Sequence, residues 1–206
     1  MLMSKLLLCL APGSTMFRVA NYVGIILACC ILVSPSLASE LVANGGFESG
    51  DFSSWTTLPA SSGTDFGVNG NNPHSGTNDA FFAAVGQYDD SIMQTLPTVE
   101  GQSYKIDFYL AHANYDAHAD FTASWNGNTI LSLVDSNFFY YTKYSFTEVA
   151  TSATTTLQFS GRESVSFIFL DDVSVQPIPE PSTFVLLSAG VFGFLAYVCR
   201  KRKQAG

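Results

Sequence analysis

Two uncharged apolar segments, one near each end, restrict the water-soluble fold of this chain to the residues between them. The first runs from Val23 to Val33, and the second runs from Phe184 to Cys199. Neither has the polar face of an amphipathic helix that packs on a soluble core. We therefore expect one folded domain over residues 39–176, with a hydrophobic segment on either side.

Residues 1–38 have the order of a secretory signal peptide. Arg18 precedes the apolar run, and the small residues Ser36 and Ala38 suit cleavage by signal peptidase after Ala38. The segment is long for a signal peptide, which leaves Met16 open as the true start. Lipoprotein processing at Cys29 is the alternative. Both interpretations predict export.

The C-terminal segment, residues 177–203, begins with a proline-rich tetrapeptide. Pro179 and Pro181 fix their own φ and favour extended backbone at Ile178 and Glu180, so the segment is stiff and accessible to an enzyme.

An apolar stretch and a basic tail follow. A helix over 183–199 would be about 25 Å long, at the short end of the range for crossing a bilayer. The cations after it, Arg200, Lys201, Arg202 and Lys203, would stay in the cytoplasm. We expect a single transmembrane helix with the domain on the far side of the inner membrane.

This order of residues resembles the PEP-CTERM sorting signal of exported proteins in Gram-negative bacteria that make exopolysaccharide. The resemblance implies recognition by an exosortase, with processing near Pro179, Glu180 and Pro181. The inner membrane would be a transient anchor. The processed protein would then be at the cell surface or in the extracellular matrix.

The central domain is acidic and lacks cysteine. All 17 acidic residues except Glu180 lie in it, against three cations, Lys105, Lys143 and Arg162. Such a surface argues against nucleic acid as a partner. The chain's four cysteines lie in the terminal segments, so the domain has no disulfide and no thiol site.

The domain's sequence pattern is almost entirely that of β-strands. Alternation of apolar and polar residues over 104–110 predicts a half-buried strand. Asn126-Gly127, between two apolar stretches, predicts a tight hairpin. Short strands with Gly, Asn and Ser turns predict an all-β, two-sheet antiparallel sandwich.

Two segments at opposite ends of the domain add a second resemblance. Leu41–Trp55, which contains Asn44-Gly45-Gly46-Phe47-Glu48, and Phe169–Val175, which contains Asp171-Asp172, look like the first and last strands of the galactose-binding-like jelly roll. That fold occurs in the carbohydrate-binding modules of glycanases. The resemblance implies a jelly-roll fold, and a shared fold does not imply a shared ligand.

The same resemblance implies a structural calcium ion. In such modules the ion lies where the first and last strands meet, which carries over to Glu48 and Asp171, with the Gly46 carbonyl as a further ligand. Hard oxygen ligands fit calcium. The alternative is that both carboxylates accept hydrogen bonds from turn amides and so tie the ends of the domain together.

Glycan binding requires flat aromatic rings beside polar groups. The candidate rings are Trp55, Tyr88, Tyr109, Tyr115, Trp125, Tyr140 and Tyr141, with Asn114, Asp116 and Gln87 as polar partners. Tyr109 and Tyr115 are the preferred rings. Trp125, next to a tight turn, is more typical of a packing residue.

Catalytic signals are few. His112, Asp116, His118 and Asp120 form a polar group that we interpret as a solvated loop, and no nucleophile elbow or phosphate loop is present. The sequence therefore predicts a noncatalytic surface or matrix protein, with exopolysaccharide as the expected partner. An adhesive or structural protein is the alternative, and a polysaccharide-acting enzyme comes third.

Overall fold

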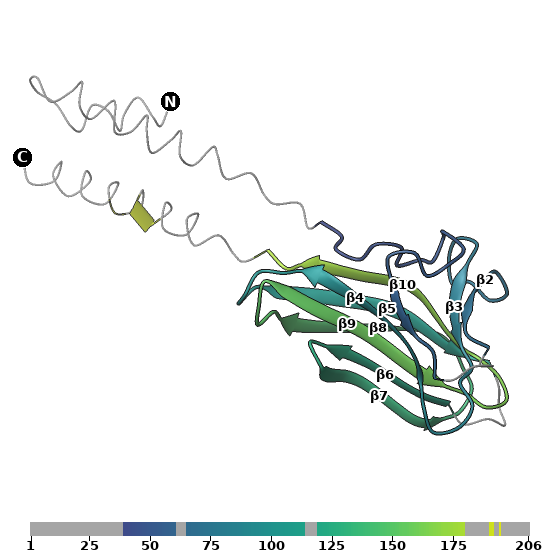
Figure 1. Cartoon of the computed structure of the whole chain (residues 1–206). Coiled ribbons are helices and arrows are strands. Elements are labelled where there is room, and N and C mark those ends of the chain that lie inside the picture. Colours follow the sequence, from purple (N-terminus) through teal and green to yellow (C-terminus); the bar gives the residue numbers. More distant parts are fainter. Residues whose placement is uncertain (1–38, 61–64, 114–118, 180–189, 192–193, 195–206) are drawn as a thin grey trace, which may run out of the picture. The chain divides into compact units, whose positions relative to one another are not determined.

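The computed structural model describes residues 39–60, 65–113, 119–179 and, farther on, Gly190, Val191 and Phe194 (Figure 1). The predicted signal peptide, Glu180, Pro181 and the basic tail lie outside these residues, as does most of the predicted membrane span. Gly190, Val191 and Phe194 are helical. Within the described part of the chain, no helix is long and apolar enough to cross a membrane.

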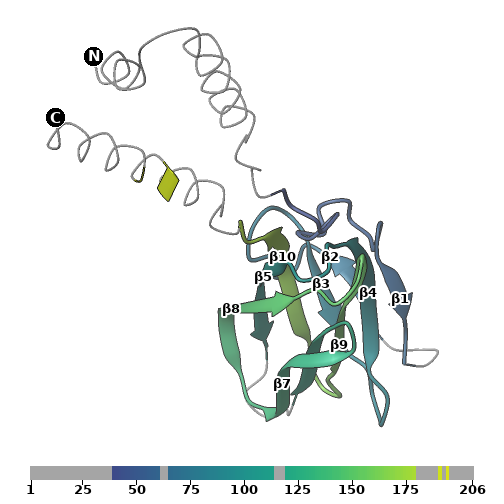
Figure 2. The ribbon, with the colours of Figure 1, turned by 90° about the vertical axis from the view of Figure 1, so that its left-hand side faces the viewer.

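Ala38–Ile178 form one compact unit, built from two antiparallel sheets of five strands each (Figures 1 and 2). Sheet A has the order β1-β4-β9-β6-β7, and sheet B has the order β2-β3-β10-β5-β8. The strands are β1 (Thr56–Leu58), β2 (Gly67–Asn69), β3 (Asp79–Phe82), β4 (Asp90–Pro97), β5 (Ser103–His112), β6 (Ala119–Trp125), β7 (Asn128–Ser136), β8 (Phe139–Val149), β9 (Thr154–Arg162) and β10 (Ile168–Pro177). The predicted two-sheet sandwich is confirmed.

Local pattern accounts for the central strands. In β5, Tyr104, Ile106, Phe108 and Leu110 are buried, as the alternation predicts. The predicted hairpin joins β6 and β7, and both Asn126 and Gly127 have positive φ, 50° and 79°. Positive φ at both turn residues matches the right-handed twist of paired strands.

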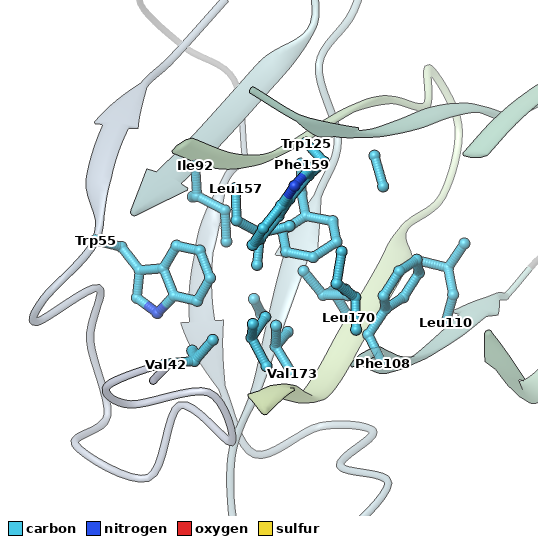
Figure 3. Close-up of a cluster of buried hydrophobic side chains, with 14 of the residues drawn as sticks. Val42, Trp55, Ile92, Phe108, Leu110, Trp125, Leu157, Phe159, Leu170 and Val173 are labelled. Carbon is cyan, nitrogen blue, oxygen red and sulfur yellow. The ribbon is translucent and has the colours of Figure 1, made fainter. Parts of the chain in front are cut away.

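The core lies between the sheets and is rich in aromatic side chains (Figure 3). Phe108 and Phe159 meet edge to face, with ring centroids 5.0 Å apart, and Phe159 also contacts Trp55 from the N-terminal segment. Because β5 and β9 belong to different sheets, these contacts hold the two layers together.

The first segment of the domain is not the strand that the resemblance suggested. Leu41–Trp55 forms turns, with positive φ at Asn44 and Phe47, which interrupts any ladder. The segment nevertheless lies against β10, because the Leu41 amide donates to the Val175 carbonyl and the Val173 amide donates to that of Gly45. A Cβ at Gly45 would lie 2.0 Å from the Val173 oxygen, so only glycine permits this approach.

Candidate functional site

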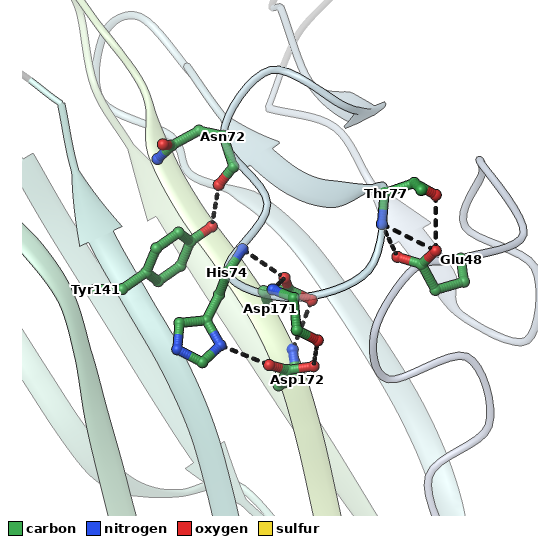
Figure 4. A network of polar contacts seen from close by, with 8 residues as sticks. Glu48, Asn72, His74, Thr77, Tyr141, Asp171 and Asp172 are labelled. Atoms are coloured by element: carbon green, nitrogen blue, oxygen red, sulfur yellow. Dashed lines mark hydrogen bonds and ion pairs between the residues drawn. The ribbon is translucent and has the colours of Figure 1, made fainter.

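Glu48 anchors the loop between β2 and β3 to the N-terminal segment (Figure 4). Its carboxylate accepts hydrogen bonds from the Thr77 hydroxyl at 2.7 Å and from the amides of Thr77 and Asn78 at 2.9 and 3.0 Å. The Thr77 hydroxyl and then these amides hold the pKa of Glu48 below its ordinary value. At Gly76, with φ of 65°, a Cβ would lie 2.3 Å from Glu48 Oε1, so this loop requires glycine there.

Asp171 anchors the same loop from β10 (Figure 4). One of its carboxylate oxygens accepts hydrogen bonds from the amides of His74 and Ser75 at 2.8 and 3.1 Å, and the other accepts one from the Asp172 amide at 2.7 Å. Burial raises the pKa of Asp171, although these amides oppose the effect.

Asp172 lies at an irregularity in β10. Its φ is 50°, and the register with β5 shifts between Asp171 and Ser174. The irregularity lets both neighbouring carboxylates reach the loop: Asp172 pairs with His74 Nδ1 at 2.6 Å and accepts the Ser75 hydroxyl at 2.7 Å.

Asp79, at the start of β3, is a member of this group that the sequence analysis missed. It has 0% exposed surface, and Oδ1 accepts the Asn72 amide at 3.2 Å, whereas Oδ2 has no hydrogen-bond partner. The pairing that sets Ala80 opposite Leu170 brings Asp79 next to Asp171. Burial, with the Asp171 charge nearby, raises the pKa of Asp79 to about 6. We call Glu48, Asp79, Asp171 and Asp172 the acidic cluster.

The acidic cluster offers oxygen ligands of the kind that calcium prefers. A Cβ at Gly46 would lie 3.8 Å from the Glu48 Cγ and 3.9 Å from an Asp171 oxygen, so the three residues expected from the resemblance lie close together. Glu48 and Asp171 already accept hydrogen bonds from several backbone amides, as expected if they tie the ends of the domain together without a metal ion. Within the cluster, the carboxylate oxygen without a hydrogen-bond partner belongs to Asp79. Among the described residues, no group of three or more His, Cys, Asp or Glu side chains is arranged to hold a metal ion.

Tyr109, a predicted glycan platform, is partly covered by a side chain of the same loop. His74 stacks on its ring with centroids 3.6 Å apart, and Lys143 Nζ lies 5.8 Å from the ring centre. Tyr141 stands beside His74 and donates its hydroxyl proton to the Asn72 carbonyl at 2.8 Å. Burial and the neighbouring carboxylates raise the pKa of Tyr141. Tyr109 therefore supports the loop.

Trp125, another predicted glycan residue, is not available on the surface. Trp125 is 2% exposed, packs on Tyr104, and directs its indole N–H towards the Val149 carbonyl at 3.4 Å. This is the packing role that its place beside a turn suggested. Asn114 and Tyr115 lie outside the described residues.

Two exposed tyrosines lie at the end of the sandwich where β3, β5, β7 and β9 end. Tyr88 is 73% exposed and Tyr140 is 77% exposed. Both were among the candidate rings in the sequence, and Tyr88 follows Gly86, whose φ is 110°.

Next to Tyr88 in the chain is a group of charged side chains on the outer face of sheet A. Arg162, which ends β9, pairs with Asp120 of β6, lies 3.6 Å from Asp89 Oδ1, and donates to the Gln87 carbonyl at 3.5 Å. Burial raises the pKa of Asp89, while Arg162 opposes that shift. We call Asp89, Asp120 and Arg162 the Arg162 cluster.

Hydroxyl groups make the next row on the same face. Ser91, Ser160 and Thr122 lie side by side on β4, β9 and β6, and the Ser91 and Ser160 oxygens are 2.8 Å apart. Ser91 and Ser160 are only 8% and 9% exposed, so Thr122 is the partly exposed hydroxyl of this row. The face therefore presents a guanidinium, carboxylates and a hydroxyl, close in the chain to an exposed ring, and these are groups that a sugar contacts.

His112 is not the solvated loop residue that the sequence suggested. Its side chain has 0% exposed surface, and Nε2 lies 2.8 Å from Glu163 Oε2, which is equally buried. Glu163 Oε1 accepts the Val165 amide at 2.9 Å. Sequence reasoning missed Glu163 because the two residues are brought together only by the packing of the two sheets.

Solved structures with this fold include sugar-binding and adhesive domains. The structure of TmCBM61 in complex with β-1,4-galactotriose has a TM-score of 0.51 and 15% identity, and the match covers 68% of this chain and 100% of that one. The K3 adhesin domain of Lys-gingipain from Porphyromonas gingivalis W83 has a TM-score of 0.50 and 18% identity, with 67% and 99% covered. The fold is thus a jelly-roll sandwich similar to that of these domains.

The sorting address is identified separately. Residues 177–203 match the PEP-CTERM protein-sorting motif, so the chain is an exported protein that an exosortase processes. No curated protein matched the chain.

Proposed function

We propose that this protein is a noncatalytic component of the cell surface or exopolysaccharide matrix and that it binds glycan on the outer face of sheet A. The observation that carries the proposal is the exposed side chain of Tyr88, next in the chain to Asp89 of the Arg162 cluster. An exported protein with this fold meets polysaccharide at its destination.

The chemistry of that face favours a polar carbohydrate. Apolar ring faces of a sugar stack on an aromatic side chain, while its hydroxyls pair with guanidinium, carboxylate and hydroxyl groups. The acidic domain repels polyanions. Neutral glycans are therefore the expected ligands, such as uncharged exopolysaccharide chains.

Calcium at the acidic cluster is proposed from the resemblance, although the described side chains are not arranged as a metal site. Glu48, Asp171 and the Gly46 carbonyl are the ligands implied by resemblance, and the unpartnered Asp79 oxygen adds a fourth group that gains from a cation. The ion would neutralise carboxylates that anchor the loop between β2 and β3.

Binding of the purified domain, residues 39–178, to the producing organism's exopolysaccharide tests the function. We expect saturable retention in affinity electrophoresis that a simple neutral sugar reverses. Tyr88→Ala should weaken retention at least tenfold, since one aromatic–sugar contact and the order it imposes on the site are lost.

Tyr140→Ala is the matched control, because Tyr140 is equally exposed but belongs to β8 of the other sheet. If Tyr88→Ala and Tyr140→Ala lost polysaccharide retention equally, the assignment of the glycan site to sheet A would be contradicted. A folded domain that retains no polysaccharide with or without calcium would reject glycan binding and favour the adhesive alternative.

A further inference from the structure

The sorting motif begins inside the folded sheet. The motif covers residues 177–203, yet β10 extends to Pro177, which pairs with Tyr104 of β5. One residue later, the Ile178 amide donates to the Ser103 carbonyl at 2.8 Å. The first two residues of the motif are therefore held by the domain that precedes it.

A side chain adds to this backbone pairing. Gln102 donates from Nε2 to the Ile178 carbonyl at 2.5 Å. Gln102 is itself fixed in the turn before β5, because its amide donates to the Val99 carbonyl and its carbonyl accepts the Ala150 amide, both at 3.0 Å. We call Gln102, Ser103 and Ile178 the C-terminal latch.

Few residues separate the C-terminal latch from the predicted membrane span, so an enzyme has only a short free segment to bind. Only Pro179–Ser182 lie between Ile178 and the predicted membrane span, and that stretch extends at most about 14 Å. An enzyme that binds an extended peptide on both sides of the bond it cuts needs several free residues. Residues paired in a sheet become available only through local unfolding.

We propose that the exosortase acts on a form of this protein in which the end of β10 has left β5, and that Gln102 is a positioning residue that sets how often this occurs. The inference rests on processing of the PEP-CTERM motif. The processing rate then follows the population of the opened latch, as it does wherever opening and closing are faster than cleavage.

The test is pulse-chase processing of the full chain in cells that carry the exosortase and in matched cells that lack it. Gln102→Ala removes one hydrogen bond to Ile178 and should accelerate processing roughly three- to tenfold. A flexible insert of about six Gly and Ser residues between Ile178 and Pro179 should accelerate it as well, because the motif then clears the sheet.

A disulfide that links β10 to β5, here called the staple, should slow processing. Gln176 is paired with Lys105, and directly paired residues on antiparallel strands are close enough for a disulfide. The double variant Lys105→Cys/Gln176→Cys should be processed at least tenfold more slowly when oxidised and at the ordinary rate with reductant. Gln176→Cys alone controls for the thiol.

Thr151→Ala is the matched control for Gln102→Ala. It removes the hydrogen bond from Asn126 to Thr151 at the same end of the sandwich without touching β10. Ordinary processing rates in Gln102→Ala, the insert and the oxidised staple would overturn the latch. A wild-type chain left uncut in exosortase-bearing cells would instead contradict the sorting role itself.

Discussion

Replacing Asp79 with Asn should stabilise the calcium-free domain at neutral pH. Asp79 is fully buried, one carboxylate oxygen has no partner, and Asp171 lies next to it. Asn keeps the shape and the acceptor for the Asn72 amide but carries no charge. The substitution thus removes an unfavourable buried charge while the remaining contacts stay in place.

The pKa of Asp79 sets the size and the sign of this effect. Burial raises it from 3.8 to about 6, and each unit between folded and unfolded values corresponds to about 1.4 kcal/mol. The gain in the free energy of unfolding from Asp79→Asn is therefore at most about 3 kcal/mol, and screening by solvent near the loop lowers the expected gain to about 1–2 kcal/mol. Because the folded state binds the proton more tightly, the wild-type free energy of unfolding falls as pH rises from about 4 to 6.

Urea denaturation between pH 4 and 8, with a chelator present, measures the free energy of unfolding of wild type and of Asp79→Asn. The difference between Asp79→Asn and wild type should be near zero at pH 4, grow up to about pH 6 and then remain constant. The exposed Asp65, changed to Asn, is the control. A variant less stable than wild type at pH 7.5 would refute the reasoning. Added calcium should stabilise wild type more than the variant, because Asp79 gains from the cation.

Two further changes test the buried polar contacts. His112→Leu or Glu163→Leu alone should lower the free energy of unfolding by about 3–5 kcal/mol, because each leaves its buried partner unpaired. The double variant should lose far less than the sum of the two single losses, and additive losses in denaturant titrations would contradict this coupling. Glu48→Ala should speed hydrogen exchange at the Thr77 and Asn78 amides about tenfold, with core amides as the internal reference, and unchanged exchange would show that Glu48 does not anchor the loop.

Residues close together in the chain determined the features that sequence reasoning predicted. Alternation in β5 and the Asn126-Gly127 turn are local, since side-chain period and backbone φ depend on neighbouring residues. The sorting motif is local too, because a short extended segment is read as a linear sequence. Nearness of Glu48 and Asp171 came from a resemblance and agrees with the fold.

Tertiary structure alone decided which polar groups are buried and what they contact. Asp79 faces Asp171 only because β3 pairs with β10 in one register, and a slip by one residue would turn it to the core. His112 meets Glu163 only through the closure of the two sheets. Strand pattern reports the face on which a side chain lies, whereas its neighbours on that face depend on pairing between distant strands. For that reason the sequence by itself determined the export, the sorting address and the sandwich, and the packing of the strands determined which rings and carboxylates are available to a ligand.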